Sequence, residues 1–292
     1  MLFWGMSYVW SKIVFEYYSP LTTVFLRLVL SSGFLLLYIL IMKKAQKIRK
    51  ADFGLFFLSA LFNPFLYFLG ESYGLQRVSP TISAVIIATI PLFTPVLAYF
   101  TLKEKLSFIN ILGIVISFGG ILLMTLEPDM SFRSSPLGIL FLFGGVASAI
   151  IYTVILRKLT IRYSPLCIIT YQNFIGIFYF LPFFLIFHYD NFIRVEPNRE
   201  LILSLLQLAV FASSMAFIFY TVGVRNLGMS KANVYTNLIP LFSALTSYFL
   251  LDEFFDVNKI AGMGIVIGGL LLSQLTRLKR NNFLIFYKNN KR

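Results

Sequence analysis

The chain has 292 residues, of which 58% are hydrophobic and 13% are charged, whereas soluble proteins have roughly 45–50% apolar residues. This composition excludes a soluble globular protein, because a core this large would lack a polar shell. The net charge of +13 would suggest nucleic-acid binding in a soluble protein. Here the basic residues lie between hydrophobic stretches, so we attribute them to membrane topology and expect the lipid bilayer, with no nucleic acid, as a partner.

The hydrophobic stretches predict ten membrane-spanning helices, since a hydrocarbon core of about 30 Å takes about 20 residues per helix. Ser-Pro pairs or short charge runs mark the loops, and a proline just inside a helix start is favourable. The first stretch, Met1-Leu2-Phe3-Trp4-Gly5, reads as the middle of a helix, so we expect a trimmed or mis-assigned start. In chain order the predicted spans are 1–15, 20–42, 53–73, 79–101, 108–126, 136–156, 165–188, 200–222, 231–251 and 258–275.

Basic residues predict the orientation of these spans. With the N-terminus placed in the cytoplasm, 18 Lys and Arg residues fall in inside loops or the tail and 5 fall in outside loops. Cytoplasmic loops are enriched in Lys and Arg, so we predict a multi-pass protein of the inner (plasma) membrane with both termini cytoplasmic. The basic stretch 276–292 is then a cytoplasmic tail, either flexible or lying on the anionic inner leaflet.

The two halves of the chain repeat each other. Ile90-Pro91-Leu92-Phe93 recurs 149 residues later as Ile239-Pro240-Leu241-Phe242, and Tyr18-Ser19-Pro20-Leu21 recurs after 145 residues. Each repeat, 1–127 and 136–275, holds five predicted spans, and an odd number of spans inverts the second half in the membrane. Inverted repeats are typical of secondary transporters, which bind substrate near the midplane between the repeats.

Several motifs lie along both halves of the chain. They are Trp4-Gly5 before Lys12, Ser19-Pro20-Leu21 before Arg27, Pro91 to Leu102-Lys103-Glu104 with Gly113 and Gly119-Gly120, and Pro240 to Asp252-Glu253 with Gly262 and Gly268-Gly269. In these features the sequence resembles the drug/metabolite transporter superfamily, and within it the EamA-like family. The resemblance covers residues 1 to about 275, and it implies ten helices around a central cavity with alternating access. It further implies export of amino acids, related metabolites or toxic compounds, although some members import or exchange solutes.

Charged side chains within the spans are the first candidates for a substrate site. A central Lys or Arg costs about 2.5 kcal/mol or more in a bilayer, so Lys12 and Arg27 should face protein or water. They either attract an anionic group of the substrate or are structural, paired with Glu16 or Glu71. Glu71 is a candidate coupling carboxylate for a proton or ion, with an interfacial pair to Arg77 as the alternative.

Polar and aromatic side chains supply the other cavity candidates. Asn63 and Pro64 interrupt the third span, and Tyr67 shares the helix face of Asn63. In the ninth span, Asn233, Thr236, Asn237 and Pro240 follow a helical spacing and form one stripe, which lines either a substrate surface or a helix contact.

Trp4 and Trp10 line either the cavity or an interfacial belt. Six further residues rank lower as cavity candidates: Tyr171, Gln172, Asn173, Ser213, Ser214 and Tyr220. We assign the glycines to packing, with Gly264 and Gly268 as a GxxxG pair and Gly113 with Ser117 as its analogue.

These features predict a secondary transporter of a small-molecule solute, without cofactor or metal. No GxxxxGK[ST] motif is present, so ATP hydrolysis by this chain is not expected. An intramembrane enzyme needs a nucleophile–base pair or a metal cluster at depth, and the chain has one His and one Cys. A sensor or scaffold without transport is the other alternative. Neither the substrate nor the oligomeric state follows from these residues.

Overall fold

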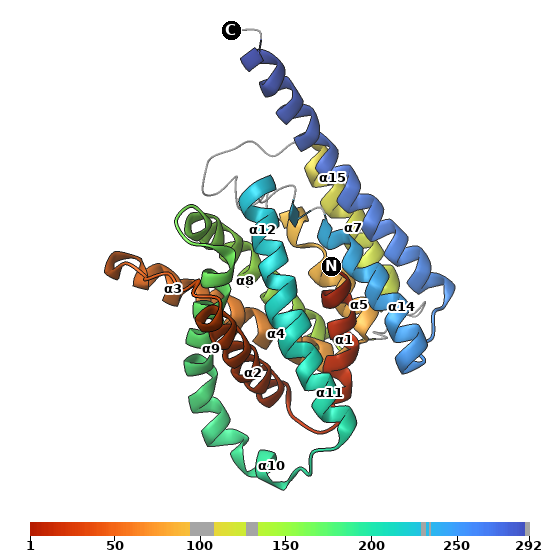
Figure 1. The fold of residues 1–292 in the computed structure, drawn as a ribbon. Coiled ribbons are helices and arrows are strands. Elements are labelled where there is room, and N and C mark those ends of the chain that lie inside the picture. Colours follow the sequence, from red (N-terminus) through yellow and green to blue (C-terminus); the bar gives the residue numbers. More distant parts are fainter. Residues whose placement is uncertain (94–107, 127–133, 229–231, 234, 290–292) are drawn as a thin grey trace.

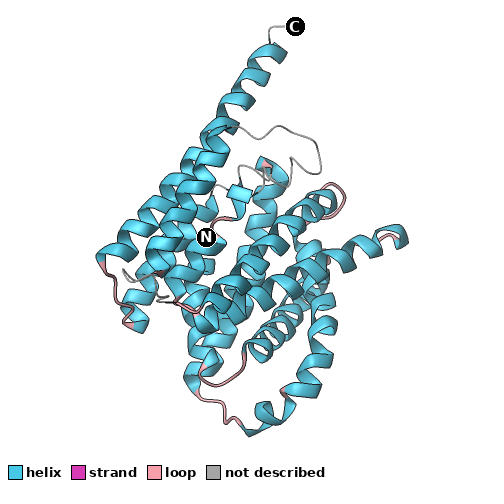
Figure 2. Ribbon diagram, turned by 180° about the vertical axis from the view of Figure 1, so that it is seen from behind, coloured by secondary structure: helices cyan, strands magenta, loops and turns pink. Residues whose placement is uncertain are grey.

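The helical prediction is confirmed. A computed structural model describes residues 1–93, 108–126, 134–228, 232–233 and 235–289, and each element in these ranges is a helix (Figures 1 and 2). Some predictions concern residues outside the described ranges. They are the predictions for 94–101 of the fourth span, Leu102-Lys103-Glu104, Lys231 and the tail end 290–292. The arrangement as two inverted five-helix repeats stays a prediction.

The helices of the first half begin close to the predicted spans, but α5 ends at Ile87, well before the predicted end of the fourth span at residue 101. They are α1 (Leu2–Phe15), α2 (Pro20–Ile41), η1 (Lys50–Asp52), α3 (Phe53–Ala60), η2 (Leu61–Leu66), α4 (Tyr67–Arg77), α5 (Pro80–Ile87) and α7 (Phe108–Thr125). The third predicted span is therefore three consecutive helical elements.

The second half has the same succession of long helices. They are α8 (Pro136–Thr160), α9 (Pro165–Phe187), α10 (Tyr189–Arg194), α11 (Arg199–Gln207), η3 (Leu208–Ala216), α12 (Phe217–Leu227), η4 (Tyr235–Leu238), α14 (Ile239–Leu251) and α15 (Val257–Asn289). Helix α15 continues past the predicted end at residue 275 and projects beyond the other helices (Figure 1).

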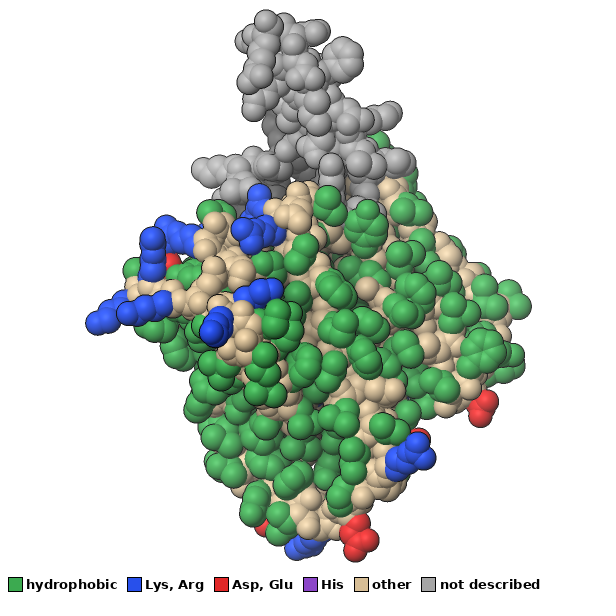
Figure 3. Space-filling model, in the orientation of Figure 1, with side chains coloured by type: hydrophobic (Ala, Val, Ile, Leu, Met, Phe, Trp, Pro, Cys, Tyr) green, Lys and Arg blue, Asp and Glu red, His purple; other side chains and the backbone are tan. Residues whose placement is uncertain are grey.

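Five helical segments are long and apolar enough to cross a membrane. Three shorter apolar helices occupy 80–93, 111–125 and 257–273. Hydrophobic side chains cover most of the visible face between the ends, and Lys and Arg gather mainly at its upper left (Figure 3). The long segments are Pro20–Ile41, Lys50–Arg77, Pro136–Thr160, Pro165–Phe187 and Arg199–Leu227.

Four helices begin with the same local structure. In each, a serine precedes a proline at the first helical position, and the serine Oγ accepts a hydrogen bond from the backbone N–H three residues on, at 3.3–3.4 Å. The serine satisfies a donor that the helix leaves free, and the proline has no N–H to satisfy. These serines are Ser19, Ser79, Ser135 and Ser164.

The helical segments Lys50–Arg77 and Arg199–Leu227 both depart from α-helical geometry near their middle. At η2 the backbone of Asn63 leaves the helical region (φ −147°, ψ 117°), directly before Pro64. The freed carbonyl of Phe62 accepts a hydrogen bond of 2.6 Å from Ser148 of α8. Segment η3 has the wider π-helical turn at the corresponding place in the second half. Irregular backbone at membrane depth needs such partners.

Helices α7 and α15 pack closely through glycines. A Cβ on Gly120 would lie 2.6 Å from the carbonyl oxygen of Gly262, and one on Gly113 would lie 2.7 Å from that of Gly269. No side chain fits at these distances, so the two backbones touch. The pairs run in opposite directions along the chain, which means that α7 and α15 are antiparallel; they lie side by side in Figure 1.

The predicted GxxxG contact of Gly264 and Gly268 is wrong. A Cβ at either position would meet nothing within 4 Å. The contact uses Gly262 and Gly269, which are seven residues apart and so share one face of the helix at 3.6 residues per turn.

Candidate functional site

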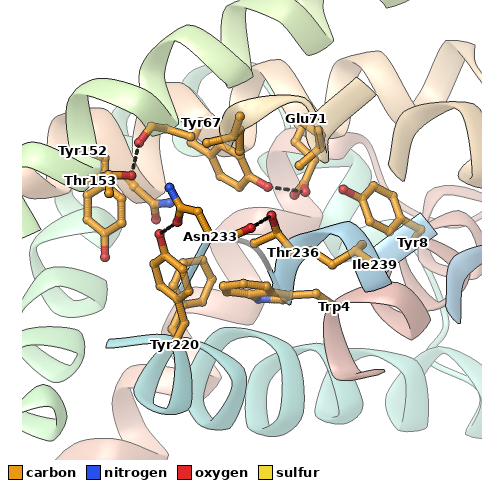
Figure 4. Close-up of a pocket in the computed structure, with 15 residues that line it drawn as sticks. Trp4, Tyr8, Tyr67, Glu71, Tyr152, Thr153, Tyr220, Asn233, Thr236 and Ile239 are labelled. Carbon is orange, nitrogen blue, oxygen red and sulfur yellow. Dashed lines mark hydrogen bonds between the residues drawn. The ribbon is translucent and has the colours of Figure 1, made fainter. Parts of the chain in front are cut away.

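A small cavity lies between the two halves, at the centre of the helices (Figure 4). Its volume is about 50 Å³, which accommodates only a few water molecules because one water needs roughly 10–15 Å³ of cavity. A metabolite therefore requires it to widen. The residues that line it come from α1, η2, α4, the region 87–90, α8, α12 and the region 233–239. They are Trp4, Tyr8, Asn63, Tyr67, Glu71, Ile87, Ile90, Ala149, Tyr152, Thr153, Phe217, Tyr220, Asn233, Thr236 and Ile239.

Among the described residues that line the cavity, Glu71 is the charged one. The Tyr67 hydroxyl donates a 2.7 Å hydrogen bond to Glu71 Oε1. In Figure 4 the hydroxyls of Tyr67 and Tyr8 both point toward Glu71. Tyr67 and Glu71 are four residues apart and so share a helix face. The sequence offered a pair with Arg77 as the alternative, but Arg77 donates to the Tyr73 carbonyl and to Gln76.

Arg27 lies behind the cavity and is not part of its lining. It is 2% exposed, its Nε donates a 2.7 Å hydrogen bond to Ser213, and its guanidinium carbon lies 4.3 Å from the centre of the Phe68 ring. Electrostatic attraction still couples Arg27 to Glu71. The candidate cation of the second span thus supports the carboxylate and has no direct access to a ligand in the cavity.

Asn233 presents an unpaired donor to the cavity. Its Oδ1 accepts a 2.6 Å hydrogen bond from the Tyr220 hydroxyl, whereas its Nδ2 has no partner although the residue is 1% exposed. Thr236 donates to the Asn233 carbonyl at 2.6 Å, so it holds the backbone in place. A buried amide N–H without an acceptor costs about 1–3 kcal/mol, and a ligand acceptor would remove that cost.

Asn63 reaches the cavity because the helix breaks at its position. Its Oδ1 lies 3.5 Å from Gln172 Nε2, and Gln172 Oε1 accepts a hydrogen bond of 3.1 Å from Ser59. This buried hydrogen-bond network joins α3 and η2 to α9. Asn63, Tyr67 and Glu71 therefore line one wall.

Aromatic rings form much of the remaining wall. The Trp4 ring lies 4.9 Å from the Phe217 ring and 5.3 Å from the Tyr220 ring. Tyr8 was missed from the sequence, although its position one turn after Trp4 was a signal for the same helix face. Tyr152 and Thr153 were also missed, and α8 carries no break or charge there to mark them.

Besides Arg27, three candidates lie outside the cavity. Trp10 is buried against α11 and η3, with its ring 6.2 Å from Phe211. Lys12 Nζ donates to the Gln76 carbonyl at 3.4 Å, near the end of α1. Asn237 is buried, and neither of its amide atoms has a partner.

The ninth-span stripe is broken, since Asn233 and Thr236 line the cavity and Asn237 does not. Thr236 and Asn237 lie in η4, a 3₁₀-helix with three residues per turn, and α14 begins after it at Ile239. The α-helical spacing that the stripe assumed is therefore not kept.

A second polar cluster joins the halves at the end where α5 and α15 begin. Glu253 accepts hydrogen bonds from Lys259 and, at 2.9 Å, from Thr81 of the other half. The Glu253 side chain is 8% exposed. Burial alone would raise the pKa of Glu253, but hydrogen bonds from Lys259 and Ser247 outweigh it and lower this pKa from its usual value.

This lowered pKa predicts an acid-dependent stability. Because the folded-state pKa lies below the ordinary 4.5, the carboxylate stabilises the fold above that pH and loses this effect as pH falls through the lower folded value. We expect the thermal midpoint of the wild type in detergent to exceed that of Glu253→Gln at about pH 7, and the gap to narrow as the pH falls below 4.5 through the lower folded value. The control is Glu196→Gln at an exposed carboxyl, and a gap independent of pH would contradict the assignment.

The cavity lacks the groups of a metal or hydrolytic centre in the part of the chain that the structure describes. No group of three or more His, Cys, Asp or Glu residues clusters there. What the cavity offers is a carboxylate, neutral hydrogen-bonding groups and aromatic faces. These groups can form hydrogen bonds and ring contacts with a small solute.

Comparisons with known proteins agree with this arrangement. The EamA-like transporter family matches residues 1–126 and 136–275. The "uncharacterized transporter YetK" of Bacillus subtilis is 25% identical over 94% of this chain and 84% of its own length. An "uncharacterized transporter" of Archaeoglobus fulgidus is 24% identical over 92% of this chain and 94% of its own. The "uncharacterized transporter YvbV" of Bacillus subtilis is 26% identical, over 93% and 88%.

A solved crystal structure has a similar fold. It superimposes with a TM-score of 0.67 and covers 94% of this chain and 98% of the other, with 15% sequence identity. At this identity the likeness concerns the fold alone.

Proposed function

Because the chain belongs to the EamA-like transporter family and is a multi-pass membrane transporter, we propose that it is a secondary transporter of small metabolites. In this proposal it exports amino acids or related compounds across the inner (plasma) membrane, with both termini in the cytoplasm. Energy comes from an ion gradient or from the substrate's own gradient. The observation that carries the proposal is a cavity lined by residues of both halves.

Helix contacts support two inverted repeats of ten helices in total, the first over 1–127 and the second over 136–275. Exchanging the halves turns the contact of α2 with η3 into that of α9 with η2, and both contacts occur. Helix α7 contacts α15 through glycine pairs that exchange with each other. Such self-complementary contacts are characteristic of two-fold symmetry.

Polar contacts near the two ends of the helices support alternating access. At one end Asp52 accepts hydrogen bonds from Arg162 at 2.9 Å and from Tyr163 at 2.7 Å, so it ties the first half to the second. At the other end Thr81 and Glu253 make a corresponding tie. Rocking of the halves about the cavity would break the polar contacts at one end while those at the other end persist. Differential binding of solute to the inward-open and outward-open states would supply the coupling of binding to this motion.

Glu71 is the carboxylate that we assign to coupling. It faces the cavity, where it is accessible to a proton, an ion or a substrate cation, and the Tyr67 hydroxyl holds it by a hydrogen bond. Intramembrane carboxylates mark proton and ion pathways in transporters. Asn63, Tyr67, Asn233, Thr236 and Trp4 complete the proposed binding surface.

A comparison of two asparagines tests the transport proposal. We expect Asn233→Leu to lower export at least about tenfold, because it removes the Tyr220 contact and the free donor in the cavity. Asn237→Leu should have a smaller effect, since Asn237 does not line the cavity.

The measurement is a metabolite screen of culture medium and cytosol from cells with the wild type, each variant or no protein, at equal membrane abundance. No metabolite that depends on the protein, or equal export by Asn233→Leu and the wild type, would remove the cavity from the transport path. A metabolite that is chemically altered would favour an enzyme instead.

A further inference from the structure

The cavity combines one carboxylate with six aromatic rings, and no basic side chain is among the described residues that line it. An ammonium group is attracted both by a carboxylate and by the negative face of an aromatic ring. The lining therefore has the chemistry of a site for an organic cation. The six rings belong to Trp4, Tyr8, Tyr67, Tyr152, Phe217 and Tyr220.

Glu71 has acceptor capacity left for an ammonium group. A carboxylate has about four lone-pair sites, and the Tyr67 hydroxyl occupies one of them. Arg27 does not take the rest, because its Nε is bound to Ser213 and its guanidinium lies on the Phe68 ring. A ligand that enters the cavity can therefore reach the carboxylate directly.

Asn233 defines the other polar end of the ligand. Its Nδ2 is a buried donor without a partner, and its Oδ1 is already taken by Tyr220. A carbonyl or hydroxyl oxygen of the ligand would satisfy this donor. A ligand carboxylate is a poor fit, because it would lose its hydration, and the described residues that line the cavity include no lysine or arginine to pair with it.

Resting on the proposed transport function, we propose that the cavity recognises small organic amines rather than zwitterionic amino acids. The ammonium group binds Glu71 and the surrounding rings, and a neutral oxygen acceptor binds Asn233. The apolar part of the ligand packs against Trp4 and Phe217. Since the cavity holds about 50 Å³, the ligand is small, and binding widens the cavity.

The fluorescence of Trp4 can report the binding of a ligand in the cavity. The chain has two tryptophans, and Trp10 lies outside the cavity, so Trp10→Phe leaves a single reporter in the lining. We would titrate this variant in detergent at about pH 7, where α-amino groups are mostly charged. The ligands share one side chain: leucinamide, isopentylamine, leucine and 4-methylpentanoate.

We expect leucinamide to change Trp4 fluorescence at the lowest concentration and isopentylamine at a somewhat higher one. Leucine should bind at least about tenfold more weakly than leucinamide, and 4-methylpentanoate should not bind. Leucine binding as tightly as leucinamide would overturn the amine assignment. So would 4-methylpentanoate binding as tightly as isopentylamine.

A variant pair locates the ammonium group. With Trp10→Phe as background, Arg27→Met/Glu71→Gln removes both charges together and should abolish binding of isopentylamine, whereas Asn233→Leu should weaken leucinamide more than isopentylamine. If the double variant does not fold, the titration with the four ligands still tests whether the cavity prefers amines. Metabolite export that depends on Asn233, with no amine binding, would sink this inference alone. Amine binding without any such export would sink the transport proposal alone.

Discussion

Replacing Gly120 with leucine is expected to prevent most of the chain from reaching its folded state, at a cost of roughly 3 kcal/mol or more. A Cβ at this position would lie 2.6 Å from the Gly262 carbonyl oxygen and 2.8 Å from the Val266 side chain. The backbone of α15 blocks the added side chain, so α7 and α15 must separate. The measurement is the thermal midpoint and the monodisperse fraction after extraction in detergent.

The neighbouring glycine supplies the control. A Cβ on Gly119 meets nothing within 4 Å, and the residue is exposed on the outer face of α7. Gly119→Leu should therefore fold as the wild type does, although the sequence change is identical and one residue away. Equal loss in the two variants would mean that the helix contact runs through another face.

Replacing Arg27 with methionine is expected to cost about 1.5–3 kcal/mol, the range for losing a hydrogen bond to a charged group. Methionine retains the apolar stem but loses the Ser213 hydrogen bond and the contact with the Phe68 ring. It also leaves the Glu71 carboxylate without the cation that attracts it. We expect a large drop in thermal midpoint. Arg77→Met, at an exposed arginine, should change it by roughly 0.5 kcal/mol or less.

A double variant separates stability from transport. Arg27→Met/Glu71→Gln removes both charges and should recover at least about half of the lost stability, because no buried charge is left alone. It should not recover export, since Glu71 lines the cavity. Strictly additive losses of stability in the two single variants would show that Arg27 and Glu71 are not coupled. Full export by the double variant would show that Glu71 has no role in transport.

Local features of the sequence determined the helices. Hydropathy located helices such as α2 and α9 within one residue at each end, and the Ser-Pro pairs at Ser19 and Ser164 marked where they begin. These signals act within a few residues, since a cap needs only a serine and the N–H three residues on. The interruption at Asn63 and Pro64 was also readable, because a proline removes a donor wherever it stands.

The tertiary structure alone decided which residues face the cavity. Glu71 meets Tyr8 from another helix, and Asn233 meets Tyr220, while Asn237 and Trp10 turn elsewhere. In a soluble protein an apolar stripe would mark the buried face of each helix. In a membrane the lipid is as apolar as the protein interior, so hydropathy does not tell the two faces of a helix apart. Helix rotation is then fixed by close backbone contacts such as Gly120 with Gly262 and by scattered hydrogen bonds, which depend on partners far away in the sequence.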